Sequence, residues 1–476
     1  MKTNRSALLF LPWLWASIAG ASPNPPQPSA PSPGAEASTA TFEIEPGSTI
    51  GPGDDAVRIG LSGLPPGERV RLTASRYVYS SVLGGKRLIF KSEAWFKVGA
   101  AGTLDLASAV PEKGSSYAGA DLHGLFWSMV PTEEPVPADA KPGRVRLLAE
   151  VAEVAGRPAA EATIEFVQSL PEVRIEPIAA FPGALLASLP GEGKKPVIVL
   201  LGGAEGGAKA AREEAPKLAS LGFAVLGLPY YSPARGFGGE REIPELPADF
   251  AEIPVDRLGA VYEWIKSRPD LDSERVGLYG ASKGAELALL AASRFAWVKS
   301  VVAVAPSDVV WEGWGWGVAP GTRSSFSWEG KPLPFVPYVD FFREILGGSP
   351  DGEIHIRRPH DRGRAAHPAE AVAARIPVER YAGPLLLIAG QDDQLWNAGM
   401  MAHNIAERRA EAKLETVAWI YSDAGHYLNG DGWSSTTHFN LGQEKSGGTP
   451  AGNARARIDA RIRMVEFLRR TLAPGR

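Results

Sequence analysis

The chain has 476 residues, among them 53 Gly, 41 Pro, 13 Trp and no Cys, and 44% of its residues are hydrophobic, enough for one or more cores. Fifty basic and 54 acidic side chains give a net charge of −4, which argues against general electrostatic binding to nucleic acid or to an anionic membrane. The absence of cysteine excludes disulfides, thiolate metal sites and thiol nucleophiles, so a covalent nucleophile must be Ser, Thr, Lys or a carboxylate.

The N-terminus has the pattern of an export signal over residues 1–21. Lys2 and Arg5 supply the positive charge, a mostly apolar run follows, and small residues around Ala21 form a cleavage site. The alternative is a short membrane anchor, but the apolar run is about a dozen residues long and a membrane span needs roughly 20. Residues 22–40 are rich in Pro, Ser and Ala and are expected to form a tether. We therefore expect an exported protein, periplasmic or extracellular, without stable membrane insertion after cleavage.

The next part of the chain, residues 41–178, is predicted to be an all-β sandwich resembling an immunoglobulin domain. Short alternating or β-branched runs are separated by Gly, Pro and Asn turn signals, and long helical periodicity is absent. The expected strands include residues 41–46, 57–64, 69–80, 86–99 and 144–155.

Residues 179–476 have a different pattern, in which apolar strand-like runs alternate with helix-length segments. Such alternation predicts an α/β domain with a mostly parallel sheet covered on both faces. The expected strands are residues 197–201, 224–228, 276–279, 301–305, 385–389 and 416–421, and the expected helices are residues 209–221, 255–267, 283–294, 398–412 and, as a packing rather than a membrane-binding helix, 455–472.

The sequence G-x-S-x-G occurs at residues 280–284, with Ser282 at its centre. The motif alone is weak, but here it follows an apolar strand and precedes a helix rich in Ala and Leu. That context is typical of a nucleophile elbow, in which glycines allow a sharp turn and the serine projects from the sheet edge. The alternative is a glycine-rich turn that contains an incidental serine.

A nucleophilic serine needs a base, and the base needs an orienting acid; on this fold both follow the serine, acid first. Asp393 follows the strand at residues 385–389, and His426 follows the strand at residues 416–421. Asp392 is the rival acid. Six further histidines are expected at surface or structural positions: His123, His355, His360, His367, His403 and His438. Among them His438 is the next best candidate for the base.

An oxyanion hole requires backbone N–H donors beside the serine. The amide of Lys283 is one candidate, because it follows the nucleophile at a helix N-terminus. The other is Gly203 or Ala204, in the glycine-rich loop after the strand at residues 197–201. That loop lacks the spacing of a phosphate-binding loop. The Lys283 side chain is expected at the surface, with substrate contact as the alternative.

An aromatic segment at about residues 307–340 is expected to form a lid or a wall of the acyl pocket, with Trp311, Trp314 and Trp316 as candidate substrate contacts. The alternative is a loop that its aromatic residues pin down. No metal-binding motif occurs, and no metal or cofactor is expected.

Taken together, these motifs resemble the acyl-CoA thioesterase/bile acid-CoA:amino acid N-acyltransferase (BAAT) family of the α/β-hydrolase superfamily. The resemblance covers about residues 41–427 and rests on residues 102–106, 114–121 and 124–129 in the first domain and on residues 246–254, 277–284 and 390–396 in the second. It implies a two-domain protein whose triad is Ser282, Asp393 and His426. It also implies hydrolysis rather than transfer, because in this family a serine nucleophile goes with thioesterases and a cysteine with amino-acid acyltransferases.

The sequence therefore predicts an exported serine hydrolase that cleaves small-molecule acyl esters or thioesters through an acyl-serine intermediate. The export signal is a departure from the family, because its familiar members act where CoA is present. Esters or thioesters other than those of CoA are therefore candidate substrates as well. Two alternatives are an acyltransferase to an amine or an amidase on the same scaffold, and a non-catalytic binding protein.

Overall fold

The computed structural model describes residues 40–54, 56–80, 83, 85–152, 159–234, 239–346 and 351–472. The predicted signal at residues 1–21 and, apart from Ala40, the predicted tether at residues 22–40 lie outside the described residues. All described residues belong to one compact unit.

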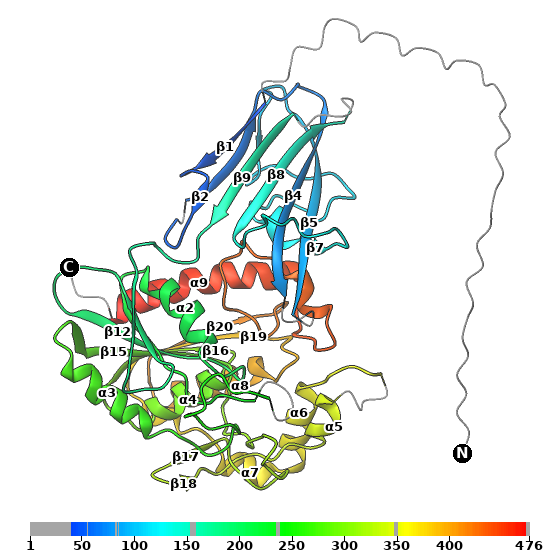
Figure 1. Ribbon diagram of the computed structural model, residues 1–476. Coiled ribbons are helices and arrows are strands. Elements are labelled where there is room, and N and C mark those ends of the chain that lie inside the picture. Colours follow the sequence, from blue (N-terminus) through cyan, green and yellow to red (C-terminus); the bar gives the residue numbers. More distant parts are fainter. Residues whose placement is uncertain are drawn as a thin grey trace, which may run out of the picture. The chain divides into compact units, whose positions relative to one another are not determined.

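The first region consists of two sheets packed around a core, as predicted (Figure 1). A three-stranded sheet has the order β1-β3-β6, and a six-stranded sheet has the order β2-β9-β8-β4-β5-β7. The longest strands of the six-stranded sheet, β4 and β5, pair antiparallel over their whole length. Residues 69–74 of β4 and 91–97 of β5 alternate buried with more exposed side chains, as a half-buried sheet requires. The elements are β1 (Thr41–Glu45), β2 (Thr49–Ile50), β3 (Arg58–Ser62), β4 (Arg69–Ser80), β5 (Lys86–Lys97), β6 (Leu104–Asp105), α1 (Gly124–Trp127), β7 (Val130–Pro131), β8 (Arg144–Val151) and β9 (Ala160–Phe166).

The second region contains an eight-stranded sheet in the order β10-β11-β13-β12-β15-β16-β19-β20. Strand β11 is antiparallel to both neighbours, and the remaining pairs are parallel. This is the strand arrangement of an α/β hydrolase, so the predicted fold class is confirmed. The strands are β10 (Arg174–Pro177), β11 (Leu185–Ser188), β12 (Lys195–Leu201), β13 (Ala224–Gly227), β15 (Leu271–Ala281), β16 (Val298–Val304), β19 (Leu385–Gly390) and β20 (Thr416–Tyr421).

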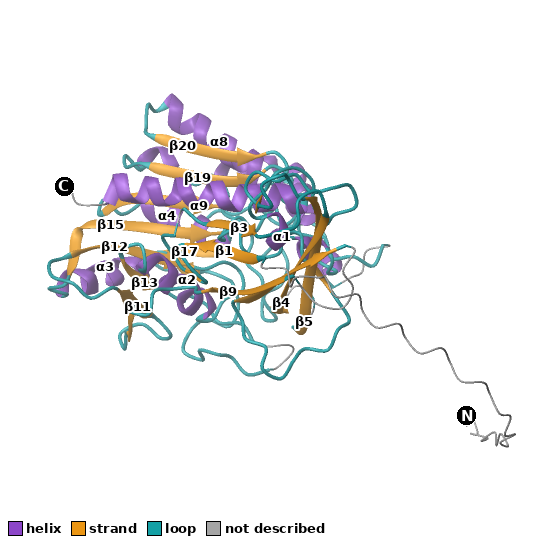
Figure 2. Ribbon diagram, turned by 90° about the horizontal axis from the view of Figure 1, so that it is seen from above, coloured by secondary structure: helices purple, strands orange, loops and turns teal. Residues whose placement is uncertain are grey.

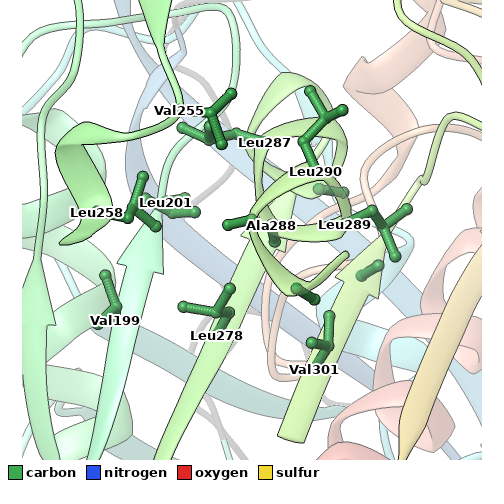
Figure 3. Packing of buried hydrophobic residues seen from close by; sticks show 14 of the residues in the cluster. Val199, Leu201, Val255, Leu258, Leu278, Leu287, Ala288, Leu289, Leu290 and Val301 are labelled. Atoms are coloured by element: carbon green, nitrogen blue, oxygen red, sulfur yellow. The ribbon is translucent and has the colours of Figure 1, made fainter. Parts of the chain in front are cut away.

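Helices cover both faces of this sheet (Figure 1), and Figure 2 shows the same helices and strands from above. Helices α3 (Arg257–Ser267), α4 (Lys283–Ala292) and α8 (Ala398–Glu411) bury their apolar sides in one core, and α2 (Lys209–Ala219) and α9 (Pro450–Leu472) bury theirs in another. Figure 3 shows the first core, where leucines of α4 pack onto valines and leucines of β12, β15 and β16. The C-terminal helix is the packing helix that the sequence predicts, beginning five residues earlier than expected.

Several short elements that the sequence did not predict lie between the main ones. They are β14 (Ile253–Pro254), β17 (Phe326–Trp328), β18 (Lys331–Pro332), α5 (Phe341–Ile345), α6 (Arg357–Ala366), α7 (Pro368–Ala373) and two turns of 3₁₀ helix, Val378–Arg380 and Thr437–Asn440. Strand β10 precedes residue 179 but pairs in the second sheet, so that sheet begins a few residues before the predicted start of its domain. No described helix is long and apolar enough to cross a bilayer.

Candidate active site

Ser282 lies in a sharp turn between β15 and α4, at the edge of the sheet. Its backbone has φ 55° and ψ −122°, a strained conformation for a residue other than glycine, and its N–H donates to the Val304 carbonyl at 2.9 Å. A Cβ on Gly280 would lie 2.2 Å from the Gly284 oxygen, and one on Gly284 would lie 2.2 Å from the Leu201 oxygen. Both glycines are therefore required for the turn, and the structure has the nucleophile elbow that the motif predicts.

The predicted acid and base lie at the same edge and contact each other. His426 Nδ1 lies 2.7 Å from Asp393 Oδ2, Asp393 is fully buried, and His426 is 5% exposed. The other carboxylate oxygen of Asp393 accepts the backbone N–H groups of Leu395 at 2.8 Å and Trp396 at 3.2 Å. The carboxylate is thus fixed on both oxygens, and its bond to Nδ1 leaves Nε2 as the ring nitrogen available for proton exchange.

Asp392, the rival acid, points elsewhere. Its carboxylate accepts the Gly448 N–H at 2.9 Å and the Gln394 side-chain amide at 2.7 Å, and the residue is exposed. His438, the rival base, has its ring edge-on to Phe90 of the first region, with centroids 5.4 Å apart. Geometry therefore favours Asp393 and His426.

The glycine-rich loop lies beside the elbow, as expected, because a Cβ on Gly203 would come within 3.3 Å of the Ser282 Cβ. The Gly203 N–H, however, donates to Glu205 Oε1 at 3.0 Å. This is a correction: Gly203 is not a free oxyanion donor, because the carboxylate two residues on captures its amide. Ala204 remains a candidate, and Lys283, as the first residue of α4, has no acceptor within the helix for its N–H.

Two tyrosines hold this loop, and the sequence analysis missed both. Tyr230 Oη donates to the Gly202 carbonyl at 2.6 Å, and Tyr231 Oη donates to the Ala204 carbonyl at 2.6 Å. Burial raises the pKa of both phenols, so they stay protonated donors across the working pH range. The sequence did contain a signal for them, because both tyrosines directly follow β13. Since β12 and β13 are parallel, the end of β13 lies beside the loop after β12.

The side chain of Lys283 is buried, which overturns the expectation that it lies at the surface. It is 3% exposed, and its Nζ lies 2.6 Å from Glu286 Oε2 and 2.9 Å from Ser325 Oγ. Burial lowers the pKa of Lys283 and raises that of Glu286, while their mutual attraction opposes both shifts. The sequence carried a signal for this pair, because positions i and i+3 on a helix share a face.

The aromatic segment at residues 307–340 is anchored in the fold rather than laid over it. Trp311 is 1% exposed and donates its indole N–H to Ser307 Oγ at 2.9 Å, whereas Trp316 is 64% exposed. Trp314 is half-buried and stacks on Phe250, with ring centroids 4.3 Å apart. Trp311 thus belongs to the core and Trp316 to the surface, and the expected substrate contacts of Trp311, Trp314 and Trp316 stay predictions.

Aromatic rings lie around the predicted base. His360 is buried with its ring edge-on to Trp311 and Trp396, and its Nδ1 lies 2.7 Å from the Ile356 carbonyl, so that nitrogen carries the proton. Burial lowers the pKa of His360 to about 3, so the ring is neutral. Trp396 in turn lies edge-on to His426, with centroids 5.9 Å apart.

The described part of the chain contains cavities and one group of possible metal ligands. A cavity of about 10 Å³ borders Gly203 and Tyr231, and one of about 190 Å³ lies between Phe166, Leu218 and Met464 and contains no triad residue. The ligand atoms of Asp351, Glu353 and His355 lie within 4.8 Å of one another, but Arg358 and Lys445 pair with the two carboxylates.

Known families match both regions of the chain. Residues 54–180 match the acyl-CoA thioester hydrolase/BAAT N-terminal region, and residues 259–319 and 349–474 match the BAAT/acyl-CoA thioester hydrolase C-terminal region. The chain belongs to the acyl-CoA thioesterase/BAAT family.

Named relatives align along nearly the whole length. Acyl-coenzyme A thioesterase 2, mitochondrial, from Rattus norvegicus is 28% identical over 97% of this chain and 96% of its own. Human acyl-coenzyme A thioesterase 1 is 28% identical over 88% of this chain and 94% of its own. The mouse peroxisomal succinyl-coenzyme A thioesterase is 27% identical over 82% of this chain and 86% of its own.

Solved structures resemble the chain more distantly. An esterase from Rhizomucor miehei has a TM-score of 0.40 at 17% identity and covers 64% of this chain and 86% of its own. An esterase from Pyrococcus furiosus has a TM-score of 0.33 at 16% identity over 61% and 87%.

Proposed function

We propose that this family member is an exported serine hydrolase of acyl thioesters or esters that works through an acyl-Ser282 intermediate. The observation that carries the proposal is the Asp393–His426 pair, 2.7 Å apart and buried, at the sheet edge where strained Ser282 projects. Membership of a thioesterase family, and relatives named as acyl-CoA thioesterases, supply the substrate class.

In the first half of the proposed reaction, Ser282 Oγ attacks the acyl carbonyl carbon while His426 Nε2 takes the hydroxyl proton. Asp393, hydrogen-bonded to Nδ1, stabilises the imidazolium that forms. The N–H groups of Lys283 and Ala204 donate to the oxyanion of the tetrahedral intermediate. Collapse breaks the bond to the leaving group, which departs with the proton from His426.

In the second half, water attacks the acyl-serine carbonyl. His426 takes a proton from that water, and the second tetrahedral intermediate collapses to a free carboxylic acid as the proton returns to Ser282 Oγ. No metal or cofactor is needed for either half.

A test of this proposal is hydrolysis of matched acyl-CoA, acyl-pantetheine and p-nitrophenyl ester series by wild type and by Ser282→Ala. We expect turnover of at least one series by wild type and its loss in the variant. Activity that survives the substitution contradicts the assignment. Amines added to the assay distinguish hydrolysis from transfer, because an acyltransferase releases an amide conjugate.

Export is the second part of the proposal and rests on residues 1–21. The test is fractionation of cells that express the full chain or a chain without residues 2–21, with the N-terminus of the product determined. We expect the full chain outside the cytoplasm with Ser22 as its first residue. Retention of an uncleaved chain in the cytoplasm contradicts export and makes CoA thioesters available as substrates.

A further inference from the structure

A buried ion pair lies directly behind the proposed nucleophile and takes no part in the triad. Lys283 and Glu286 are 3% and 0% exposed, and their charged atoms are 2.6 Å apart. When an ion pair is buried, the free energy of hydration that its charges lose is rarely recovered by their mutual attraction. Two apolar residues at these positions would therefore make the folded protein as stable or more stable. The fold therefore does not explain the pair.

Each member of the pair reaches beyond the helix that carries it. Lys283 Nζ donates to Ser325 Oγ at 2.9 Å, and this hydroxyl donates on to the Glu312 carbonyl at 2.8 Å. Glu286 Oε1 accepts the backbone N–H of Trp311 at 3.2 Å. The pair thus joins the first turn of α4 to two points of the aromatic segment at residues 307–340.

Aromatic rings enclose the ammonium group on its other sides. The rings of Phe250, Trp314 and Phe326 have centroids 5.1, 5.4 and 5.3 Å from Nζ. The ring of Trp396 lies 6.0 Å away, and its backbone N–H is one of the two that hold the Asp393 carboxylate. The far end of the Lys283 side chain is therefore fixed by charge, hydrogen bonds and rings together.

The near end of that side chain is attached to the Cα of Lys283, whose backbone N–H is a proposed oxyanion donor. Fixing Nζ restricts rotation of the peptide between Ser282 and Lys283, which follows a residue in a strained backbone conformation. We propose that the Lys283–Glu286 pair is a positioning device that holds the Lys283 N–H in place as oxyanion donor. This inference rests on the proposed function, since it concerns the oxyanion of that reaction.

The test separates positioning from stability by removing one charge and then both. Lys283→Met leaves Glu286 buried without a partner, so we expect a lower Tm and a lower kcat. Adding Glu286→Gln removes the stranded charge and keeps an acceptor for the Trp311 N–H. In this double variant we expect the Tm to return close to the wild-type value while kcat stays about tenfold or more below it, with KM within about threefold.

Recovery of kcat together with Tm in the double variant overturns the inference, because the pair is then only structural. A raised KM at unchanged kcat also overturns it, because an oxyanion donor acts on the transition state. If the double variant does not fold, Ser325→Ala decides, since it removes one anchor of Nζ without burying a charge. We expect about a threefold to tenfold lower kcat at unchanged KM, and a wild-type kcat overturns the inference.

A matched control is Arg409→Lys. Arg409 is fully buried but lies at the opposite edge of the sheet, where it donates to carbonyls before β19 and β20. We expect its Tm to fall while kcat per folded molecule is unchanged. Wild type and Ser282→Ala are assayed alongside: if wild type has no Ser282-dependent activity the proposed function fails, whereas an active wild type with a fully recovered double variant refutes only the positioning role.

Discussion

The two edges of the eight-stranded sheet each hold a buried cation, and they hold it differently. At the edge where the strands begin, Arg409 donates to four backbone carbonyls, those of Val378, Tyr381, Gly383 and Glu415, and to Thr416 Oγ1. At the edge where the strands end, Lys283 is held by the side chains of Glu286 and Ser325.

Under the positioning proposal, this difference distinguishes a structural site at Arg409 from a site at Lys283 that serves catalysis. Backbone carbonyls accept the hydrogen bonds of a buried guanidinium without burying a second charge. At Arg409 these bonds also connect loops to the sheet. The second buried charge at the Lys283 site, that of Glu286, adds a desolvation cost. In return it fixes the position of the Lys283 side chain. Substitutions at the strand-end edge are therefore expected to change rate, and those at the opposite edge to change stability.

The largest effect is expected from Ser282→Ala. Loss of the nucleophile is expected to lower kcat by about 10³-fold to 10⁶-fold with Tm little changed, measured on the best substrate of the series and by thermal unfolding. Ser293→Ala, at the other end of α4, is the control: its hydroxyl donates to the Leu290 carbonyl at 2.8 Å, and activity is expected to remain.

Asp393→Asn is expected to come next, with kcat lowered by about 10³-fold to 10⁴-fold, because an amide can present its NH₂ to Nδ1 and favour the wrong tautomer of His426. Asp392→Asn is the matched control, since its carboxylate contacts Gly448 and Gln394 rather than the histidine. Equal losses in the two variants would contradict the pairing seen in the structure.

Tyr231→Phe tests the glycine-rich loop. It removes the bond to the Ala204 carbonyl, so the proposed second oxyanion donor loses an anchor and kcat is expected to fall about tenfold. Tyr381→Phe removes a phenol–carbonyl bond at the opposite edge, to Pro384 at 3.3 Å, and is expected to lower Tm only. A rate loss of similar size in both variants would remove the distinction between the two edges.

The smallest effect concerns pH and stability. Burial lowers the pKa of His438 to about 4, whereas an unfolded histidine titrates near pH 6.5. Between these values the unfolded chain binds a proton at His438 that the folded chain does not, so this histidine lowers stability as the pH falls from 6.5 toward 4. His438→Phe is expected to remove about 2 kcal/mol of this loss, measured as free energy of unfolding at pH 7.5 and 4.5. An unchanged pH slope would contradict it.

Much of the fold could be predicted because apolar runs and turn residues dictate it locally. Strand β4 and strand β20 have the predicted bounds, and the elbow followed from Gly280 and Gly284 flanking Ser282 between a strand and a helix. The directions of parallel strands then brought residues from three strand ends to one edge.

What could not be predicted depends on contacts between distant segments. The Gly203 amide is lost to Glu205 through a local side-chain bond that composition does not reveal. The burial of Lys283 depends on Ser325 and on rings from three separate segments. A charged residue is taken as exposed unless its partners are known. Antiparallel β10 is exposed along its length and has no apolar pattern, and β11 is apolar and buried but only four residues long, too short to be recognised as a strand.

The central claim, that Ser282 forms a covalent acyl-enzyme with help from His426, is tested most directly by a fluorophosphonate probe and peptide mass spectrometry. The account predicts one adduct per chain, located on the peptide that contains Ser282, absent from Ser282→Ala and strongly slowed in His426→Ala. An unlabelled wild type, or a label that persists in Ser282→Ala, would contradict it.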